Sequence, residues 1–195
     1  MLTEVLKESH GKVFINVKTS QERFNEKPIM EEQQFPTKPP TRKDHHMRVG
    51  ILMGSKSDES KMVKAKETLE EFGIEHEWRV LSAHRNPDQV VELVSTARET
   101  GFVAFICGAG MAAHLAGVVA AHTTLPVVGV PLSGGALNGQ DALYATVQMP
   151  KGVPVATVAI DGSQNAALLV IQMLGITNKE IAEKLATYKK EMANK

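Results

Sequence analysis

The chain has 195 residues, of which 43% are hydrophobic, and this is enough to fill the core of one domain. Lys and Arg together number 22, as do Asp and Glu, so the charge balance gives no indication of a nucleic acid partner. The single cysteine, Cys107, excludes an internal disulfide and a cysteine-based zinc site. We expect it to be a small buried residue at a strand end.

No apolar run reaches the roughly eighteen residues of a membrane span, and the N-terminus lacks the layout of a signal peptide. We therefore expect a soluble, cytoplasmic protein.

Residues 1–46 differ in character from the rest of the chain. Four prolines lie there among Glu, Gln, Lys and Thr, with a single glycine, so little apolar surface is available to offset the entropy of ordering. We expect a poorly ordered N-terminal extension, either a leader or an added tail, followed by one folded domain over 47–195. Residues 12–17 could form a strand, but no pairing partner is predicted. Side chains of two adjacent residues generally project in different directions, so we do not expect His45 and His46 to bind a metal ion.

Five apolar runs indicate the strands of a sheet, at residues 49–53, 74–81, 102–107, 126–130 and 153–160. The run at 74–81 alternates apolar and polar side chains, as a strand near a sheet edge does. Helical spacing predicts helices at 59–72, 87–101, 111–121, 141–148, 165–174 and from 178 to the C-terminus. Strand and helix alternate without a break, which predicts a flavodoxin-like three-layer sandwich. Its sheet would be doubly wound, five-stranded and parallel, with an added C-terminal helix.

The predicted helix at 111–121 is apolar almost all round, which indicates burial on more than one of its faces. A single domain of this size has little room for such a helix. We therefore expect it to lie at a subunit interface.

Three polar loops follow predicted strands: Gly54–Asp58 (GSKSD), Ser82–Asp88 (SAHRNPD) and Gly108–His114 (GAGMAAH). Ligand sites in open α/β sheets lie beyond the carboxyl ends of the strands, so we expect the three loops to form one site.

In the first loop, hydroxyl and amide groups at a helix N-terminus suit a phosphate, and Asp58 could accept the two hydroxyls of a ribose. The alternative is that Ser57 or Asp58 only caps the helix, which this loop alone favours. The loop matches neither the Walker pattern nor the dinucleotide fingerprint.

In the second loop, His84 can take and give protons at neutral pH, and Arg85 can pair with a phosphate through its planar fork. A surface histidine beside an arginine is about as consistent with this loop alone. In the third, Gly108, Ala109 and Gly110 bring bare backbone close to a ligand, and His114 fits a positioning or core role better than proton transfer. No nucleophile elbow or metal-ligand spacing is present.

Together these loops resemble the phosphoribosylaminoimidazole carboxylase catalytic subunit family. The resemblance covers residues 48–192 and rests on ordered motifs: GSKSD, SAHR-x-PD, GAG-x-AAHL-x-G, VGVP, Y-x-x-VQMP-x-G-x-PV and NAALL. The Ala-Ala-His-Leu after the third strand is typical of the bacterial mutases of the family, rather than of the enzymes that use carbon dioxide directly. Residues 47–195 would then be a catalytic domain.

The resemblance implies conversion of N5-carboxyaminoimidazole ribonucleotide to 4-carboxy-5-aminoimidazole ribonucleotide in IMP biosynthesis. The carboxylate on the exocyclic nitrogen leaves as carbon dioxide, which recombines at ring carbon 4. It implies no metal, no organic cofactor, a homo-octamer, and a functional link to the ATP-dependent synthetase that makes the substrate.

By the same resemblance, His84 is the general acid and base. The resemblance also implies that four residues bind the phosphate and ribose of the substrate: Ser55, Ser57, Asp58 and Arg85. It implies that six others surround the imidazole ring and its carboxylate: Ser82, Gly108, Ala109, Gly110, His114 and Leu115.

Two alternatives are open. One is a direct carboxylase that joins carbon dioxide to aminoimidazole ribonucleotide. The other is a non-catalytic nucleotide-binding module, against which the intact trio of Ser82, His84 and Arg85 argues.

Overall fold

The computed structural model describes residues 5–9, 12–16 and 47–194, and the chain divides into two compact units, residues 1–44 and 45–195. In the first unit, β1 (Val5–Ser9) and β2 (Lys12–Asn16) form an antiparallel pair. The expectation that the strand at residue 12 has no partner was therefore wrong. The missed signal is the two-residue connection His10-Gly11, because short connections containing glycine favour hairpins. The expectations for residues 17–46 and for the His45-His46 pair lie outside the described residues.

The second unit is built on a five-stranded sheet whose neighbouring strands all run parallel. Its strands are β3 (Arg48–Met53), β4 (Glu75–Val80), β5 (Phe102–Gly110), β6 (Val127–Leu132) and β7 (Ala156–Thr157). Their spatial order is β4-β3-β5-β6-β7, which is the strand order of the flavodoxin-like fold. The predicted fold class is confirmed, and the strand with alternating side chains does lie at an edge.

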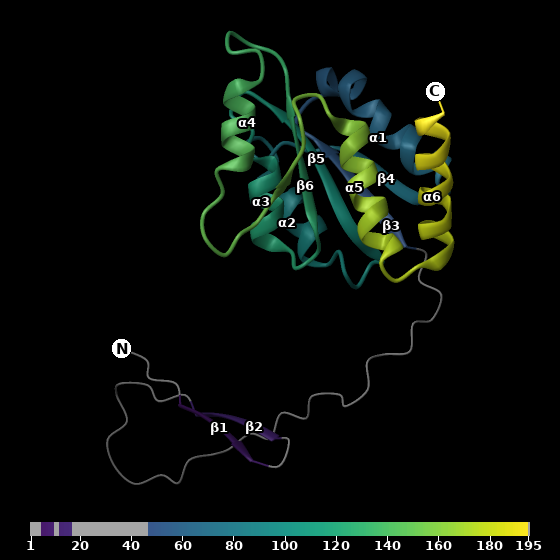
Figure 1. Ribbon diagram of the computed structural model, residues 1–195. Helices are drawn as coiled ribbons and strands as arrows, with labels where there is room; N and C mark the ends of the chain where they lie inside the picture. The colour runs from purple at the N-terminus through teal and green to yellow at the C-terminus, as the bar shows by residue number, and fades with distance from the viewer. Residues whose placement is uncertain (1–4, 10–11, 17–46, 195) are drawn as a thin grey trace, which may run out of the picture. The chain divides into compact units, whose positions relative to one another are not determined.

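Helices cover both faces of this sheet (Figure 1). On one face lie α1 (Glu59–Glu71), α5 (Ser163–Gly175) and α6 (Lys179–Ala193); on the other lie α2 (Pro87–Ser95), α3 (Leu115–His122) and α4 (Gln140–Val147). Side chains alternate between the faces along β3, so Ile51 and Met53 join the first core and Leu52 joins the second. The sheet is buried between two hydrophobic layers.

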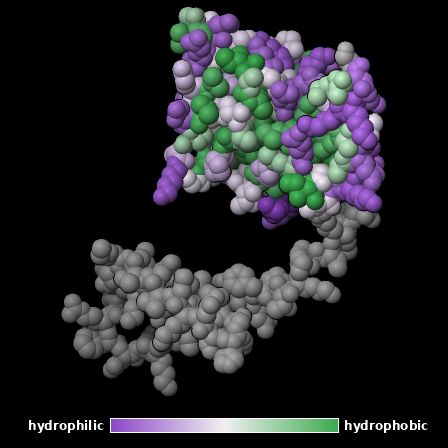
Figure 2. Space-filling view, viewed as in Figure 1, coloured by the Kyte–Doolittle hydropathy of each residue, from purple (hydrophilic) through white to green (hydrophobic). Residues whose placement is uncertain are grey.

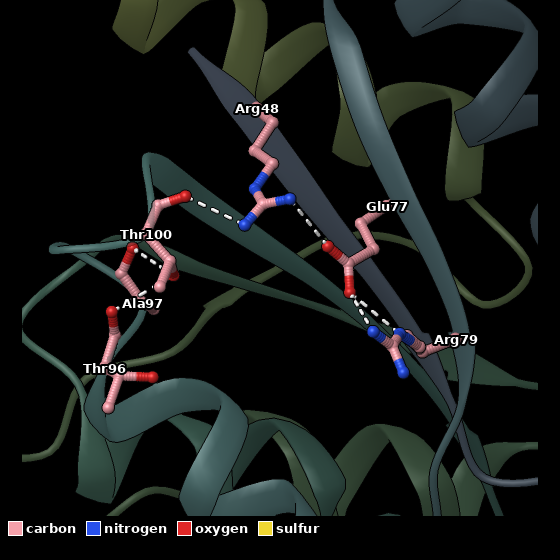
Figure 3. A network of polar contacts seen from close by, with 6 residues as sticks. All are labelled: Arg48, Glu77, Arg79, Thr96, Ala97 and Thr100. Atoms are coloured by element: carbon pink, nitrogen blue, oxygen red, sulfur yellow. Dashed lines mark hydrogen bonds and ion pairs between the residues drawn. The ribbon is translucent and has the colours of Figure 1, made fainter. Parts of the chain in front are cut away.

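At the end of the sheet where β3 begins, Arg48 connects β3 to neighbouring segments (Figure 3). The Arg48 guanidinium donates to the Thr100 carbonyl at 2.8 Å, pairs with Glu77 of β4 at 3.0 Å and lies 4.2 Å from the centre of the Phe102 ring. Glu77 in turn holds Arg79 at 2.7 Å. This end is thus occupied by structural contacts, and the polar loops lie at the other.

The largest differences from the sequence prediction lie at the boundaries of β5, α3, α2 and β7. β5 runs on through Gly110, so Gly108–Gly110 are strand residues rather than the start of a helix, and α3 begins only at Leu115. α2 stops at Ser95, because the hydroxyls of Ser95 and Thr96 bond back to the Glu92 carbonyl and compete with the regular helix. β7 has two residues instead of eight, and Pro154, which cannot donate to a strand ladder, lies before its start.

Candidate active site

The three polar loops meet beyond the carboxyl ends of β3, β4 and β5. The Gly54 amide donates to the Gly108 carbonyl at 3.3 Å, and the Leu81 amide donates to the Met53 carbonyl at 2.8 Å. The Arg85 guanidinium donates to the Gly54 carbonyl, which joins the second loop directly to the first. These contacts bring the three loops together, and their forming one ligand site stays a prediction.

The GSKSD loop forms a short 3-10 turn, Lys56–Asp58, before α1. Ser55 caps this turn: its hydroxyl accepts from the Ser57 amide at 3.3 Å and from the Ser57 hydroxyl at 3.0 Å. Asp58 occupies the N-cap position of α1, yet its side chain makes no capping bond. Asp58 therefore holds the predicted N-cap position, but its carboxylate does not cap α1 and accepts from the Ser57 hydroxyl at 3.4 Å instead.

Asp58 lies among groups with opposing effects on its pKa. Burial is the largest influence and raises the pKa above its usual 3.8. Hydrogen bonds from the Ser55 backbone and the Ser57 hydroxyl, and the charges of Lys61 and Arg85, pull the pKa back down without cancelling the rise. A partly buried carboxylate beside two cations and two hydroxyls is suited to accept hydrogen bonds from a polyhydroxyl ligand.

Ser82 organises the second loop from a buried position. Its hydroxyl oxygen accepts from the amides of His84 and Arg85, both at 3.3 Å, and its carbonyl accepts from the Asn86 amide at 2.8 Å. These bonds fold the chain so that the side chains of His84 and Arg85 are exposed while Ser82 is 8% exposed. The hydroxyl of Ser82 keeps its own proton as a donor.

His84 and His114 come together although thirty residues separate them in the chain. His84 Nε2 lies 2.8 Å from His114 Nδ1, and the rings meet edge to face at 82° with centres 4.9 Å apart. At this distance one ring must donate and the other accept. Both rings are solvent-accessible. The pair can therefore hold one proton between two imidazoles at the edge of the site.

The end of β5 forms the wall beside these histidines. Gly108 is packed so closely that an added Cβ would lie 2.4 Å from the sulfur of Met62, so a side chain at this position would require Met62 to shift. Ala109 and Gly110 are half-buried and pair with Pro131 and Leu132 of β6. The Leu115 side chain is 2% exposed and belongs to the core against α2, which leaves only its backbone to a ligand.

Three residues near the site were not anticipated: Lys61, Ser133 and Asp161. Lys61 of α1 donates to the Ser133 carbonyl, and the Ser133 amide donates to Asp161 at 2.9 Å. Only Lys61 gives any signal in the sequence, since it lies one helical turn after Asp58 and thus on the same side of α1.

The buried groups around the site do not add a nucleophile or a metal centre. Cys107, within β5 and three residues before its end, is 1% exposed, and burial raises the pKa of its thiol, so it is held as the neutral form. Within the described residues, no group of three or more His, Cys, Asp or Glu side chains is arranged to hold a metal ion. In the same part of the chain, every helix is too short or too polar to cross a membrane.

A comparison with known families matches residues 48–195 to the AIR carboxylase family. The chain belongs to the AIR carboxylase family. Its relatives include the N5-carboxyaminoimidazole ribonucleotide mutase of Pyrococcus horikoshii, 53% identical over 147 residues, which are 75% of this chain and 83% of that protein. The mutase of the same name from Thermotoga maritima is 54% identical over 145 residues, 74% of this chain and 85% of that protein.

Solved structures agree with this membership. The crystal structure of Treponema denticola PurE superposes with a TM-score of 0.69 at 31% identity and covers 76% of this chain and 92% of that chain. The AIR carboxylase family region begins at Arg48, the first residue of β3, so it contains all three polar loops. Three of the motifs behind the resemblance, GSKSD, SAHR-x-PD and GAG-x-AAHL-x-G, are thus brought together by the fold.

Proposed function

We propose that this protein is an N5-carboxyaminoimidazole ribonucleotide mutase, an isomerase of purine biosynthesis. The observation that carries the proposal is the His84–His114 pair, 2.8 Å apart, beside a loop whose hydroxyls and cations suit a phosphoribosyl group. Relatives of about half-identical sequence bear the mutase name. The fold, the family and the site chemistry therefore support one reaction.

The GSKSD loop and Arg85 would hold the phosphate and ribose of the substrate. Ser55 and Ser57 present hydroxyls at the start of α1, where helix amides and the helix dipole favour an anion. Arg85 already reaches this loop through its bond to Gly54, so its planar fork lies near where a phosphate would bind. Asp58 would accept the ribose hydroxyls, because its carboxylate is not used to cap the helix.

The backbone of Gly108, Ala109 and Gly110 would lie against the imidazole ring and its carboxylate. A site lined by bare backbone lets a planar ring approach closely, and the hydroxyl of Ser82 supplies a donor on the opposite loop. The N–H groups in the first turn of α3, where His114 is the N-cap, add donors that suit a carboxylate.

His84 would act as the acid and base. The bond between the carboxyl carbon and the exocyclic nitrogen breaks, carbon dioxide leaves, and the electron pair stays on that nitrogen, which takes a proton from the His84 imidazolium. Carbon dioxide then bonds to ring carbon 4, and His84 removes the proton that remains on that carbon. His114 supports this step by accepting from the His84 imidazolium, provided that its own proton is on Nε2.

The direct carboxylase is the second candidate, since it would use the same site with free carbon dioxide and aminoimidazole ribonucleotide. A single assay separates the two. The protein is given N5-carboxyaminoimidazole ribonucleotide without bicarbonate or ATP, and separately aminoimidazole ribonucleotide with bicarbonate. Efficient conversion of the first substrate supports the mutase. Conversion of the second alone would establish the carboxylase, and conversion of neither would indicate a binding module.

We also propose that the protein forms a homo-oligomer, for which the family resemblance implies eight subunits. Exposed hydrophobic side chains support this proposal. Four large hydrophobic side chains at the end of β5 and around α4 are exposed: Met111, Leu137, Tyr144 and Val147, here called the α4 patch. Figure 2 shows hydrophobic side chains gathered across the middle of one face of this unit. Exposed hydrophobic side chains that gather on one surface are typical of subunit contacts.

The remaining partner proposals follow from the reaction. The substrate carries an unstable carboxylate on nitrogen, so we expect a functional link to the ATP-dependent synthetase that makes it. A cytoplasmic location stays a prediction, based on the single free cysteine.

A further inference from the structure

Ser133, the first residue after β6, is held on both sides of its peptide backbone. Its amide donates to the Asp161 carboxylate at 2.9 Å, and its carbonyl accepts from Lys61 Nζ. Lys61 belongs to α1 and Asp161 to the turn before α5, so two segments far apart in the sequence hydrogen-bond to the same residue. Both bonds involve a charged group, the stronger class of hydrogen bond.

Each of the two anchors is itself fixed. The Lys61 carbonyl accepts from the Ser163 hydroxyl at 2.6 Å, and Ser163 is only 1% exposed. Asp161 has a left-handed backbone, with φ of 57°, and its amide donates to the Pro131 carbonyl at 2.9 Å. A non-glycine residue adopts this conformation at some cost in energy, so the surroundings must hold it there. The strained turn directs the Asp161 carboxylate at Ser133.

Ser133 begins the loop 133–139, which lies against the predicted substrate wall. In this loop Gly134, Gly135, Asn138 and Gly139 all have positive φ. A Cβ on Gly135 would lie 3.2 Å from the side chain of Met111, the residue that follows Gly110. Lys61 is also close enough to Asp58 to lower the pKa of that carboxylate. The hydrogen bonds of Lys61 and Asp161 to Ser133 therefore link the loop 133–139 to the GSKSD loop, and the loop itself lies against Met111 at the end of β5.

We propose that Lys61 and Asp161 are positioning residues that hold the loop 133–139 against Met111 and so retain carbon dioxide between its release and its recapture. This inference rests on the proposed mutase function. Loss of a hydrogen bond to a charged group would shift an opening equilibrium of the loop by about tenfold. Each opening before recapture releases carbon dioxide to solvent, and the enzyme then gives up aminoimidazole ribonucleotide instead of the carboxylated product.

The chain offers matched variants for this test. Asp161→Gly removes the carboxylate and relaxes the backbone at φ 57°, whereas Asp161→Asn keeps an acceptor oxygen on a residue that tolerates this conformation. Lys61→Met removes the donor, and Lys61→Arg keeps one. The measured quantity is the coupling ratio: carboxylated product formed per N5-carboxyaminoimidazole ribonucleotide consumed, after subtraction of an enzyme-free blank.

We expect the coupling ratio to fall severalfold in Asp161→Gly and in Lys61→Met, and to stay close to the wild-type ratio in Asp161→Asn and Lys61→Arg. A lowered stability alone reduces total turnover but does not change this ratio, and the Lys61 pair provides the test if an Asp161 variant folds poorly. A wild-type ratio in both Asp161→Gly and Lys61→Met overturns the inference. If the wild-type protein itself converts no substrate, the proposed function fails, and the inference fails with it.

Discussion

At the level of single residues, the Asp58 carboxylate lowers the stability of the fold at neutral pH and is free to accept hydrogen bonds from a ligand. Because burial raises its pKa above 3.8, the folded protein binds this proton more tightly than the unfolded chain does. The stability that Asp58 contributes is therefore fully present below pH 3.8 and is lost as the pH rises through its folded-state pKa. At neutral pH the carboxylate is kept at the expense of stability, as expected of a group that serves a ligand.

Asp58→Asn should accordingly raise the free energy of unfolding at pH 7, by a small amount because the carboxyl is still partly in contact with solvent. The gain should shrink as the pH is lowered toward 3.8, and ribonucleotide affinity should fall. Urea unfolding at several pH values and a binding titration measure the two effects. A variant less stable than wild type at pH 7 would show that Lys61 and Arg85 outweigh the burial of the charge.

The individual site residues were predictable to the extent that they lie at strand ends. His84, Arg85 and Asp58 follow apolar runs directly, and parallel strands bring such loops to one edge. The contact between His84 and His114 was not predictable, because it depends on β5 continuing to Gly110 before the chain turns. Asp161 was missed since nothing in its spacing connects it with Ser133.

At the level of elements, the packing of α4 on β6 depends on Gly129. A Cβ at this position would lie 2.3 Å from Thr146 Cγ2 of α4 and 3.0 Å from Val155 Cγ1. Thr146 is 2% exposed, and its hydroxyl bonds to the Ala142 carbonyl at 2.7 Å, so its side chain has no room to turn away. The helix and the strand approach each other this closely only because one residue lacks a side chain.

We therefore expect Gly129→Ala to destabilise the protein by about 1–3 kcal/mol through overpacking. The added change Thr146→Ser removes the clashing methyl group and keeps the hydroxyl, so the double variant should recover part of that loss. Chemical denaturation of the single and double variants checks this. Additive losses in the double variant would mean that the contact with Thr146 is not the source of the strain.

The elements themselves follow from hydrophobic pattern, and their boundaries do not. β3 and β6 are short apolar runs, which predict buried strands, and Asn86-Pro87 marks the start of α2. The length of β5 is set by its neighbour, because Ala109 and Gly110 find pairing partners on β6. Such partners become visible only when the strands are placed side by side.

At the level of the whole molecule, the α4 patch predicts self-association. Tyr144 and Val147 are three residues apart on α4 and 63% and 47% exposed. Tyr144→Glu and Val147→Glu should lower the mass measured by light scattering, because a buried unpaired charge opposes an interface. Ile176→Glu is the matched control, since Ile176 is 82% exposed beyond the end of α5 and should leave the mass unchanged. An unchanged mass in both α4 variants would exclude this patch as the contact.

We propose that the whole fold serves to place one proton-transferring imidazole, His84, over a bound ribonucleotide. The most direct measurement compares His84→Asn with His122→Asn, an exposed histidine at the end of α3, in turnover of N5-carboxyaminoimidazole ribonucleotide and in ribonucleotide binding. We predict that His84→Asn abolishes turnover and leaves affinity within about tenfold of wild type, or roughly 1.4 kcal/mol, while His122→Asn keeps both. Substantial turnover by His84→Asn would exclude His84 as the acid and base.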